Sequence, residues 1–203
     1  MTEKSRVLVI NGSYRDDGIT DQAVAIAVDA LEEQGAEVEV INLREHPIEF
    51  CHNCRECTLQ PGTAPGVCVI DDGMNALIGK IEAAQAYILA APTNFASVTA
   101  IFKRFMERLI PYGYWPWEQP APKFRKSGLP QKKALLISSS AAPGILGRFM
   151  YDSSKQLKMT AQTIGAKPVG TLFTGLISKE KHQRLPRKTV DRARELAARL
   201  IAA

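Results

Sequence analysis

Short apolar runs recur along the chain, and amphipathic stretches separate them. The first run, 7–10, holds four consecutive apolar residues and ends at the turn signal Asn11-Gly12. Such a run is typical of a strand buried on both faces of a parallel sheet. The second, 37–43, alternates charged and apolar residues, which is also a strand signal. We expect five strands, at 7–10, 37–43, 87–91, 134–137 and 169–173.

The intervals between these runs show helical spacing of apolar positions. In 20–34 the apolar residues fall on a wide stripe, and Gly35 follows as a stop signal. Asp71 and Asp72 are interpreted as first-turn acids that complement a helix dipole. We expect helices at 20–34, 71–84, 98–109, 147–164 and 186–202. Five strands that alternate with helices predict an α/β fold, a doubly wound parallel sheet whose ligands bind beyond the carboxyl ends of the strands.

Composition narrows the class of protein without identifying it. At 203 residues we expect one domain, 1–203, with a cysteine-containing loop at 44–69 and an aromatic loop at 111–132. The sequence shows no apolar run of transmembrane length and no secretory leader, so we expect a cytoplasmic protein. No nucleic-acid motif is recognised. The net charge is +5, with much of the basic excess at 179–199. This excess is either a solvated helix face or an attraction for anionic partners such as a nicotinamide dinucleotide phosphate.

The stretch 11–20 joins the first strand to the first helix and has the layout of a phosphate-binding loop. Free N–H groups and the dipole at a helix start favour an anion. Ser13 and Thr20 add hydroxyl donors, and Arg15 adds a positive charge. The glycine pattern of dinucleotide-binding loops and the Gly-Lys-Ser/Thr pattern of nucleotide triphosphatases are both absent. The loop suits a flavin mononucleotide (FMN) phosphate, or it is an ordinary strand-to-helix turn.

Two further polar loops follow the third and fourth strands, and we expect them to meet the first loop at one edge of the sheet. One is 92–97, and its alternative interpretation is a strand-end turn whose Phe95 packs into the core. The other is 138–144, and its serines could instead cap their own loop. The candidate ligand residues in these loops are Pro92, Thr93, Asn94, Phe95, Ser138, Ser139 and Ser140.

All four cysteines lie in the 44–69 loop. Cys51, Cys54 and Cys57 are spaced by two residues each, while ten residues separate Cys57 from Cys68. Four such thiolates suit a [4Fe–4S] cluster or zinc. The long spacer before Cys68 counts against a cluster. Free thiols or a disulfide are the alternatives.

The aromatic loop contains both tryptophans, Trp115 and Trp117. A connection of this length without regular structure is often functional. We expect it to cover a ligand, form a subunit contact or rest on a membrane surface, or else to fold back on its own domain and seal the core.

Taken together, these stretches resemble the flavodoxin-like NAD(P)H-dependent FMN reductases, and most closely the branch that includes the iron–sulfur flavoproteins. The resemblance rests on the 12–20 loop, the four cysteines, Asp71-Asp72-x-Met74 and Pro92 to Val98 with Lys103, and it covers about residues 6–175. It implies a flavodoxin-like five-stranded parallel sheet with helices on both faces, and bound FMN. It also implies a homodimer or homotetramer with the flavin near the interface.

The same resemblance implies roles for the candidate residues. Ser13, Arg15 and Thr20 would hold the phosphate, Pro92 to Phe95 would line the flavin ring, and Ser138 to Ser140 would meet its polar edge. Many relatives carry an aromatic residue where this chain has Asn94, so stacking would fall to Phe95 or to a partner subunit. The implied activity is hydride transfer from NAD(P)H to FMN and on to a flavin, quinone, azo or nitro compound, or metal. The alternative is an iron–sulfur or flavodoxin-like carrier that passes single electrons to a partner protein.

Overall fold

The structure is a computed structural model that describes residues 4–143, 147, 150–176 and 182–202. The central strands are β1 Arg6–Asn11, β2 Glu37–Asn42, β3 Ala86–Ala90, β8 Lys132–Ser139 and β9 Ala166–Thr174. The helices are α1 Ile19–Glu32, α2 Glu56–Leu59, α3 Met74–Ala83, α4 Ala100–Glu107, α6 Ser153–Thr163 and α7 Arg187–Ile201. Shorter elements are the 3-10 turns η1 Leu43–Glu45 and η2 Ile110–Tyr112 and the strands β4 Thr93–Asn94, β5 Ser97–Val98, β6 Gly113–Tyr114 and β7 Lys123–Phe124.

The five long strands form one parallel sheet in the order β2-β1-β3-β8-β9. This is the flavodoxin-like order, and it confirms the expected fold class. The chain order reverses direction between β1 and β3, where the ends of these two strands lie next to each other. At such a switch point the loops that leave neighbouring strands diverge and open a crevice for a ligand.

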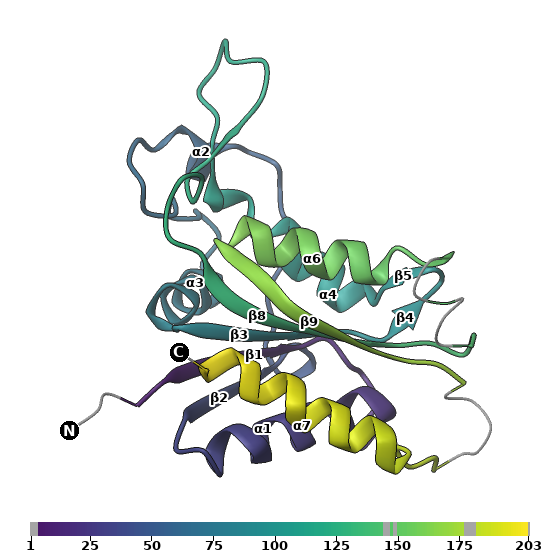
Figure 1. Ribbon diagram of the computed structural model, residues 1–203. Coiled ribbons are helices and arrows are strands. Elements are labelled where there is room, and N and C mark those ends of the chain that lie inside the picture. The colour runs from purple at the N-terminus through teal and green to yellow at the C-terminus, as the bar shows by residue number, and fades with distance from the viewer. Residues whose placement is uncertain (1–3, 144–146, 148–149, 177–181, 203) are drawn as a thin grey trace.

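Two cores lie on the two faces of the sheet. Val7, Val9 and Ile88 face the core that α1 and α7 cover. Leu8, Ile10 and Leu89 face the opposite core, which contains residues of α3, α4 and α6. Figure 1 shows these two helix layers with the sheet between them. The unbroken apolar runs therefore reflect strands that send alternate side chains into two cores.

Several expected element boundaries are wrong. Within the helix expected over 147–164, the described residues Gly147 and Met150 are helical, but the helix breaks at Tyr151 and Asp152 before α6 begins at Ser153; residues 144–146 and 148–149 lie outside the described residues. Asp152, just before it, donates its backbone N–H to the Ala96 carbonyl at 3.0 Å, a bond to the β4–β5 turn. The helix expected from Asp71 begins at Met74 instead. At both helix starts, residues that the apolar spacing had assigned to the helix lie outside it.

The expected irregular loops contain short regular elements. Strands β4 and β5 form a hairpin inside 92–98, and β6 and β7 pair across the aromatic loop. In Figure 1 the segment around α2 and the 113–124 ribbon stand together above the α3, α4 and α6 layer, away from the β4–β5 hairpin. We call residues 50–68 together with 111–125 the cysteine lobe.

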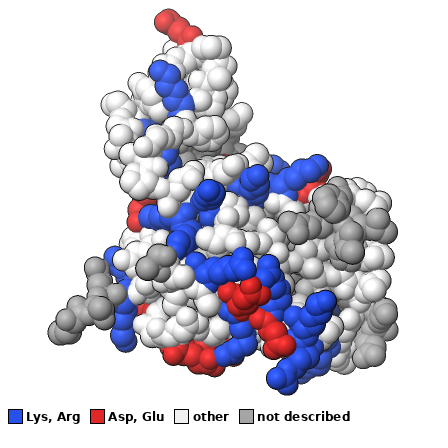
Figure 2. Space-filling view, viewed as in Figure 1, with Lys and Arg blue, Asp and Glu red and all other residues white. Residues whose placement is uncertain are grey.

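Lysine and arginine side chains gather over the face of the molecule seen in Figure 2. Of the basic stretch 179–199, residues 179–181 lie outside the described residues. On α7 the arginines alternate with acids, for example in the exposed ion pairs of Arg192 and Arg199 with Glu195. These pairs show that this part of the basic excess is exposed to solvent and partly neutralised. Among the described helices, none combines the length and the apolar character needed to cross a membrane.

Candidate functional site

A cavity of about 350 Å³ opens at the carboxyl edge of the sheet, where β1, β3 and β8 end. It brings together three loops that are far apart in the sequence. The lining residues are Ser13, Tyr14, Arg15, Asp16, Asp17, Gly18, Ile19, Thr20, Pro92, Thr93, Asn94, Thr99, Ser139, His182 and Gln183. The sequence therefore predicted the place of the cavity, and most of its candidate ligand residues line it.

The first loop turns tightly as it leaves β1. Gly12 donates its N–H to the Ala90 carbonyl at 2.7 Å, and its own carbonyl accepts the Thr99 hydroxyl at 2.7 Å. A Cβ at Gly12 would lie 2.7 Å from the Cβ of Phe102, so only glycine fits there. Next, Ser13 donates its N–H to Asn11 Oδ1 at 3.0 Å. These bonds hold the loop in its turn beside the start of α1.

The acids in and beside this loop are all paired: Asp16 and Asp21 with Arg44, and Asp17 with Arg184. Asp21, in the first turn of α1, accepts from Asn11 at 2.8 Å and forms an ion pair with Arg44 at 2.9 Å. The hydrogen bond to Asp21 raises the pKa of Arg44. Because Asp21 is paired with Arg44, its carboxylate repels an anion at the start of α1 less than an unpaired carboxylate would. Arg15 and the first N–H groups of α1 then favour phosphate in the cavity.

The serines after β8 divide between two environments. Ser139 lines the cavity, and its hydroxyl lies 2.8 Å from that of Thr20. Ser138 instead bonds to Ser153 at 3.3 Å, and Ser140 donates to the Ala142 carbonyl at 3.2 Å. Strand β8 continues to Ser139, so successive side chains alternate between the faces of the sheet. The structure therefore brings Ser139, but not its two neighbours, to the cavity.

The β4–β5 hairpin forms the second wall. Pro92, Thr93 and Asn94 line the cavity, whereas Phe95 does not. Phe95 and Ala96 form the two-residue turn with positive φ values of 49° and 63°, and the Phe95 side chain is fully exposed at 102%. The interpretation of Phe95 as a core residue is therefore wrong. Its exposure places an aromatic ring at the rim, where a ligand or another chain can reach it.

Sequence reasoning missed part of the lining. Thr99 is buried at the start of α4 and donates to Gly12, which holds the first loop against the hairpin. Asp17 is tied to Arg184 by an ion pair at 3.0 Å, and this pair connects the first loop to the segment before α7. His182 and Gln183 come from that same segment. No local pattern marks these residues, because only folding brings 182–184 beside 16–18.

The cysteine lobe closes on itself through one glutamine. Gln60 accepts the Val67 N–H at 2.8 Å and donates to the Val67 carbonyl at 3.0 Å. Gly66 packs so closely on Cys57 that an added Cβ would lie 1.9 Å from the Cys57 carbonyl oxygen. Residues 61–66 therefore form a loop that the bonds between Gln60 and Val67 close.

The four sulfur atoms are free and differ in their surroundings. Burial raises the pKa of the Cys57 thiol to about 11, and the charges of the three other cysteines contribute to the rise. Cys68 Sγ accepts an N–H from Arg108 at 3.4 Å, and Cys51 Sγ accepts the Asn53 N–H at 3.4 Å.

Thiolates hold either a single zinc ion or an iron–sulfur cluster. Zinc–thiolate bonds of about 2.3 Å hold the ligating sulfurs only about 3.8 Å apart. Within the described residues, no three His, Cys, Asp or Glu side chains are placed to hold a single metal ion together. A four-iron cluster takes four more widely spaced thiolates, and N–H bonds to sulfur tune it. All four cysteines are free thiols, the donor type that both a cluster and zinc take.

Within the aromatic loop, Tyr112 is fully buried in the core beside the sheet, whereas Trp115 and Trp117 pack on an arginine of the cysteine motif. The Arg55 guanidinium lies 4.1 Å from the ring centre of Trp115 and 4.1 Å from that of Trp117. Arg55 also donates to the Trp115 carbonyl at 2.6 Å. Since Arg55 lies between Cys54 and Cys57 in the sequence, this stacking joins the ribbon directly to the cysteine motif.

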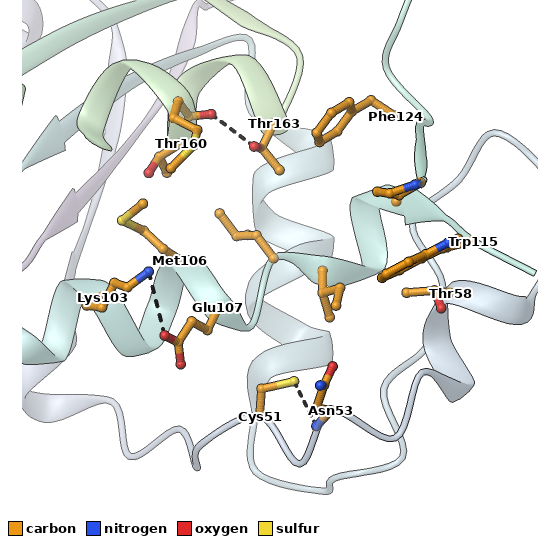
Figure 3. A pocket seen from close by; sticks show the side chains of 15 residues that line it. Cys51, Asn53, Thr58, Lys103, Met106, Glu107, Trp115, Phe124, Thr160 and Thr163 are labelled. Atoms are coloured by element: carbon orange, nitrogen blue, oxygen red, sulfur yellow. Dashed lines mark hydrogen bonds and ion pairs between the residues drawn. The ribbon is translucent and has the colours of Figure 1, made fainter. Parts of the chain in front are cut away.

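A second cavity, of about 550 Å³, lies beside the cysteine lobe. Figure 3 shows Cys51 and Trp115 near one end of it, with Lys103 and Glu107 of α4 and Thr160 and Thr163 of α6 on other walls. The two threonine hydroxyls donate to carbonyls of their own helix. This groove therefore presents mainly apolar surface, and its polar groups are largely engaged within the chain.

Comparison with known proteins connects both regions to one family. A family model described as NADPH-dependent FMN reductase matches residues 5–173. An iron-sulfur flavoprotein of Archaeoglobus fulgidus is 36% identical over 107 residues, which is 53% of this chain and 46% of that protein. The chain spans about half the length of the curated relatives it matches.

Solved structures support the same fold. An NAD(P)H:quinone oxidoreductase from Methanothermobacter marburgensis superposes with a TM-score of 0.71 at 16% identity, covering 99% of each chain. An FMN-dependent NADH-azoreductase from Bacillus anthracis, solved in complex with FMN, gives a TM-score of 0.70 at 14% identity, covering 98% of this chain and 100% of that one. At these identities the likeness extends to the fold alone.

Proposed function

Because the chain belongs to the NADPH-dependent FMN reductase family, we propose that it binds FMN in the cavity at the carboxyl edge of the sheet. There it would pass hydride from NAD(P)H to FMN and on to a small acceptor such as a flavin, quinone, azo or nitro compound, or metal. The observation that carries this proposal is the meeting of an anion-binding loop with the β4–β5 hairpin in one cavity. FMN, when bound, supplies a centre that accepts two electrons as hydride.

The residues of the cavity would divide the work of holding the cofactor. Arg15, Ser13 and the N–H groups at the start of α1 would bind the phosphate. Thr20 and Ser139, which share a hydrogen bond, would offer hydroxyls at the floor. Pro92, Thr93 and Asn94 would lie along the ring. No side chain of the cavity is needed as a nucleophile, since the chemistry belongs to the cofactor.

A comparison of FMN with riboflavin tests the assignment of the phosphate loop. Arg15→Gln removes a cation that would contact the phosphate, so FMN affinity should fall about tenfold to a hundredfold, while riboflavin, which has no phosphate, should bind as before. The matched control is Arg187→Gln, which removes an arginine that is 92% exposed on α7. Equal loss of FMN and riboflavin binding, or no loss of either, would show that Arg15 does not read the phosphate.

Turnover separates the reductase from its main alternative, a carrier that passes single electrons to a partner protein. A reductase should oxidise NADH or NADPH rapidly when given free FMN, a quinone or an azo dye. A carrier should turn over slowly with all of these and exchange electrons quickly only with a protein partner. Assays with both nicotinamides and each acceptor class would identify the substrate preference.

We also propose that the cysteine lobe binds a [4Fe–4S] cluster through Cys51, Cys54, Cys57 and Cys68. The closing of the 61–66 loop by Gln60 and Val67 supports this, because it shortens the path along the chain from Cys57 to Cys68. The iron-sulfur flavoprotein names of the curated relatives point the same way. The test is iron and acid-labile sulfide per chain after anaerobic purification. About four of each would support the cluster, and zinc or no metal would contradict it.

The chain is further proposed to form a homodimer or homotetramer. The support is Phe95, a fully exposed aromatic ring on a strained turn at the rim of the cofactor cavity. A second copy that covers this ring would also complete the cavity wall. Sedimentation of the wild type and of Phe95→Ser tests this, since the substitution should weaken assembly. A monomeric wild type would reject the proposal.

A further inference from the structure

A buried arginine organises the cysteine lobe. Arg125 directly follows strand β7 in the aromatic loop and is only 6% exposed. Its guanidinium donates to the carbonyls of Pro111 at 2.9 Å, Gly62 at 2.7 Å and Gln60 at 2.7 Å, and more weakly to that of Cys57 at 3.3 Å. These bonds engage four of its five N–H donors, and three of them draw residues 57–62 around the charge.

This buried charge has no carboxylate to neutralise it. Within the part of the chain that the structure describes, no Asp or Glu lies within ion-pair distance of Arg125. The neighbouring Arg108 shows the usual solution, a buried ion pair with Asp72. Burial lowers the pKa of Arg125. A buried cation without a counter-charge is costly.

We propose that the missing counter-charge is the cysteine centre itself, so that Arg125 electrostatically holds an anionic, thiolate-bound iron–sulfur group and sets its reduction potential. This inference rests on the proposed cluster and deepens it. Arg125 acts here as a positioning residue, because its contacts are to the carbonyls around Cys57 and not to sulfur. Arg108, which does contact Cys68 Sγ, is already paired with Asp72 and adds little net charge.

The charge balance gives the direction of the effect. Four thiolates outweigh the two positive charges of an oxidised four-iron core, so the centre is an anion in both redox states. Reduction adds one electron and one further negative charge without breaking a bond to sulfur. A fixed positive charge nearby therefore favours the reduced form more than the oxidised form. Removing the charge should lower the potential and weaken retention of iron.

The experiment uses the full chain, loaded anaerobically with iron and sulfide, and compares Arg125→Gln with Arg125→Lys. Both variants lose the forked hydrogen bonds, but only the lysine keeps the charge. Arg187→Gln removes an exposed arginine from α7 as the matched control. The readouts are iron and sulfide per chain and the midpoint potential. FMN affinity, measured at the distant cavity, reports whether each variant is folded.

Arg125→Gln is expected to shift the oxidised-to-reduced ratio at a fixed potential about tenfold towards oxidised, or about 59 mV for a one-electron couple. Arg125→Lys and the control should stay near the wild type. Equal shifts in the glutamine and lysine variants would overturn the inference, because hydrogen bonds and not charge would then matter. If the glutamine variant fails to bind FMN, the lysine variant decides alone: a wild-type potential supports the inference and a shifted one rejects it.

Failure of the proposed cluster is distinguishable from failure of this inference. A wild type that takes up no iron contradicts the cluster, and the role of Arg125 falls with it. A wild type that loads iron, with a glutamine variant of unchanged iron content and potential, leaves the cluster standing and rejects the role of Arg125 alone.

Discussion

The cofactor cavity and the cysteine lobe are built in opposite ways. The cavity is assembled at the ends of sheet strands from short polar side chains and backbone groups, such as Ser13, Thr20 and Ser139. The lobe lies away from the sheet and depends on two long buried side chains, Arg108 and Arg125. A parallel sheet brings its loops together by its topology, whereas an irregular lobe needs individual long-range contacts to define its shape.

This difference predicts that the two regions can be disabled separately. The cavity should tolerate changes in the lobe, because its walls come from β1, β3 and β8 and the loops that follow them. The lobe should tolerate changes at the cavity edge, because its contacts beyond itself include Asn75, Glu82 and Arg108, none of which lines the cavity. Four substitutions test that separation.

The largest expected effect is from Gly66→Ala. The added Cβ would lie 1.9 Å from the Cys57 carbonyl oxygen, and since the obstacle is backbone, the 57–66 segment must open. We expect iron incorporation to be lost almost completely while FMN affinity stays within about twofold. Iron analysis and flavin titration on the same preparation measure both. Loss of both ligands together would mean that the two regions fold as one unit.

The next largest effect is expected from Asp72→Asn, which leaves the Arg108 guanidinium buried without its carboxylate. The free energy of unfolding at pH 7 should fall by about 3–5 kcal/mol. Glu39→Gln, which breaks the half-exposed pair with Lys80, is the control and should cost less than about 1 kcal/mol. Urea denaturation of both variants gives the comparison.

The effect of Asp72→Asn should also depend on pH. Burial alone would raise the pKa of Asp72, but the hydrogen bonds from Arg108 and from two backbone N–H groups outweigh it and lower the pKa. The ion pair therefore stabilises the fold above the ordinary carboxyl pKa of about 4, and this contribution is lost as the pH falls through the lowered pKa. The gap between wild type and variant should narrow in acid. A gap that is constant down to about pH 2 would contradict this assignment.

Gly12→Ala should act at the cavity alone. Its Cβ would lie 2.7 Å from the Cβ of Phe102, so the loop or helix α4 must shift, at a cost of about 1–3 kcal/mol. We expect FMN affinity to fall about tenfold and iron content to be unchanged. Gly79→Ala is the matched control, since its Cβ meets nothing within 4 Å on an exposed position of α3, and it should stabilise the helix by about 0.5–1 kcal/mol. Equal effects of the two substitutions would refute the close packing at Gly12.

The smallest effect is expected from Ala96→Gly in the β4–β5 turn. Ala96 has a φ of 63°, which glycine adopts without the strain of a Cβ. The free energy of unfolding should rise by about 1 kcal/mol, with FMN affinity unchanged. A thermal melt in the presence and absence of FMN measures both. Destabilisation would show that Ala96 makes a contact that this turn geometry does not reveal.

The sequence predicted the cavity well because its main features follow the chain order. Strand, polar loop and helix start are consecutive at Ser13, Arg15 and Thr20, and parallel strands bring their carboxyl ends to one edge. The serines after β8 were predicted less well. The expected strand stopped at Ile137, but β8 runs to Ser139, so the pleat separates Ser138 from Ser139. The full exposure of Phe95 was not predicted either. The sequence of the 92–97 loop offered a ligand contact or a core position for this ring, and the structure shows neither.

The cysteine lobe shows what the amino-acid order alone could not decide. The sequence determined that four thiols lie in one loop, but counting residues made the spacer before Cys68 look too long. Only the tertiary structure shows that Gln60 and Val67 close that spacer, and that Arg125 reaches back 68 positions to the Cys57 carbonyl. Strand periodicity is a short-range property that the sequence displays directly. The partner of a buried charge is a long-range property, and it is decided only when the chain has folded.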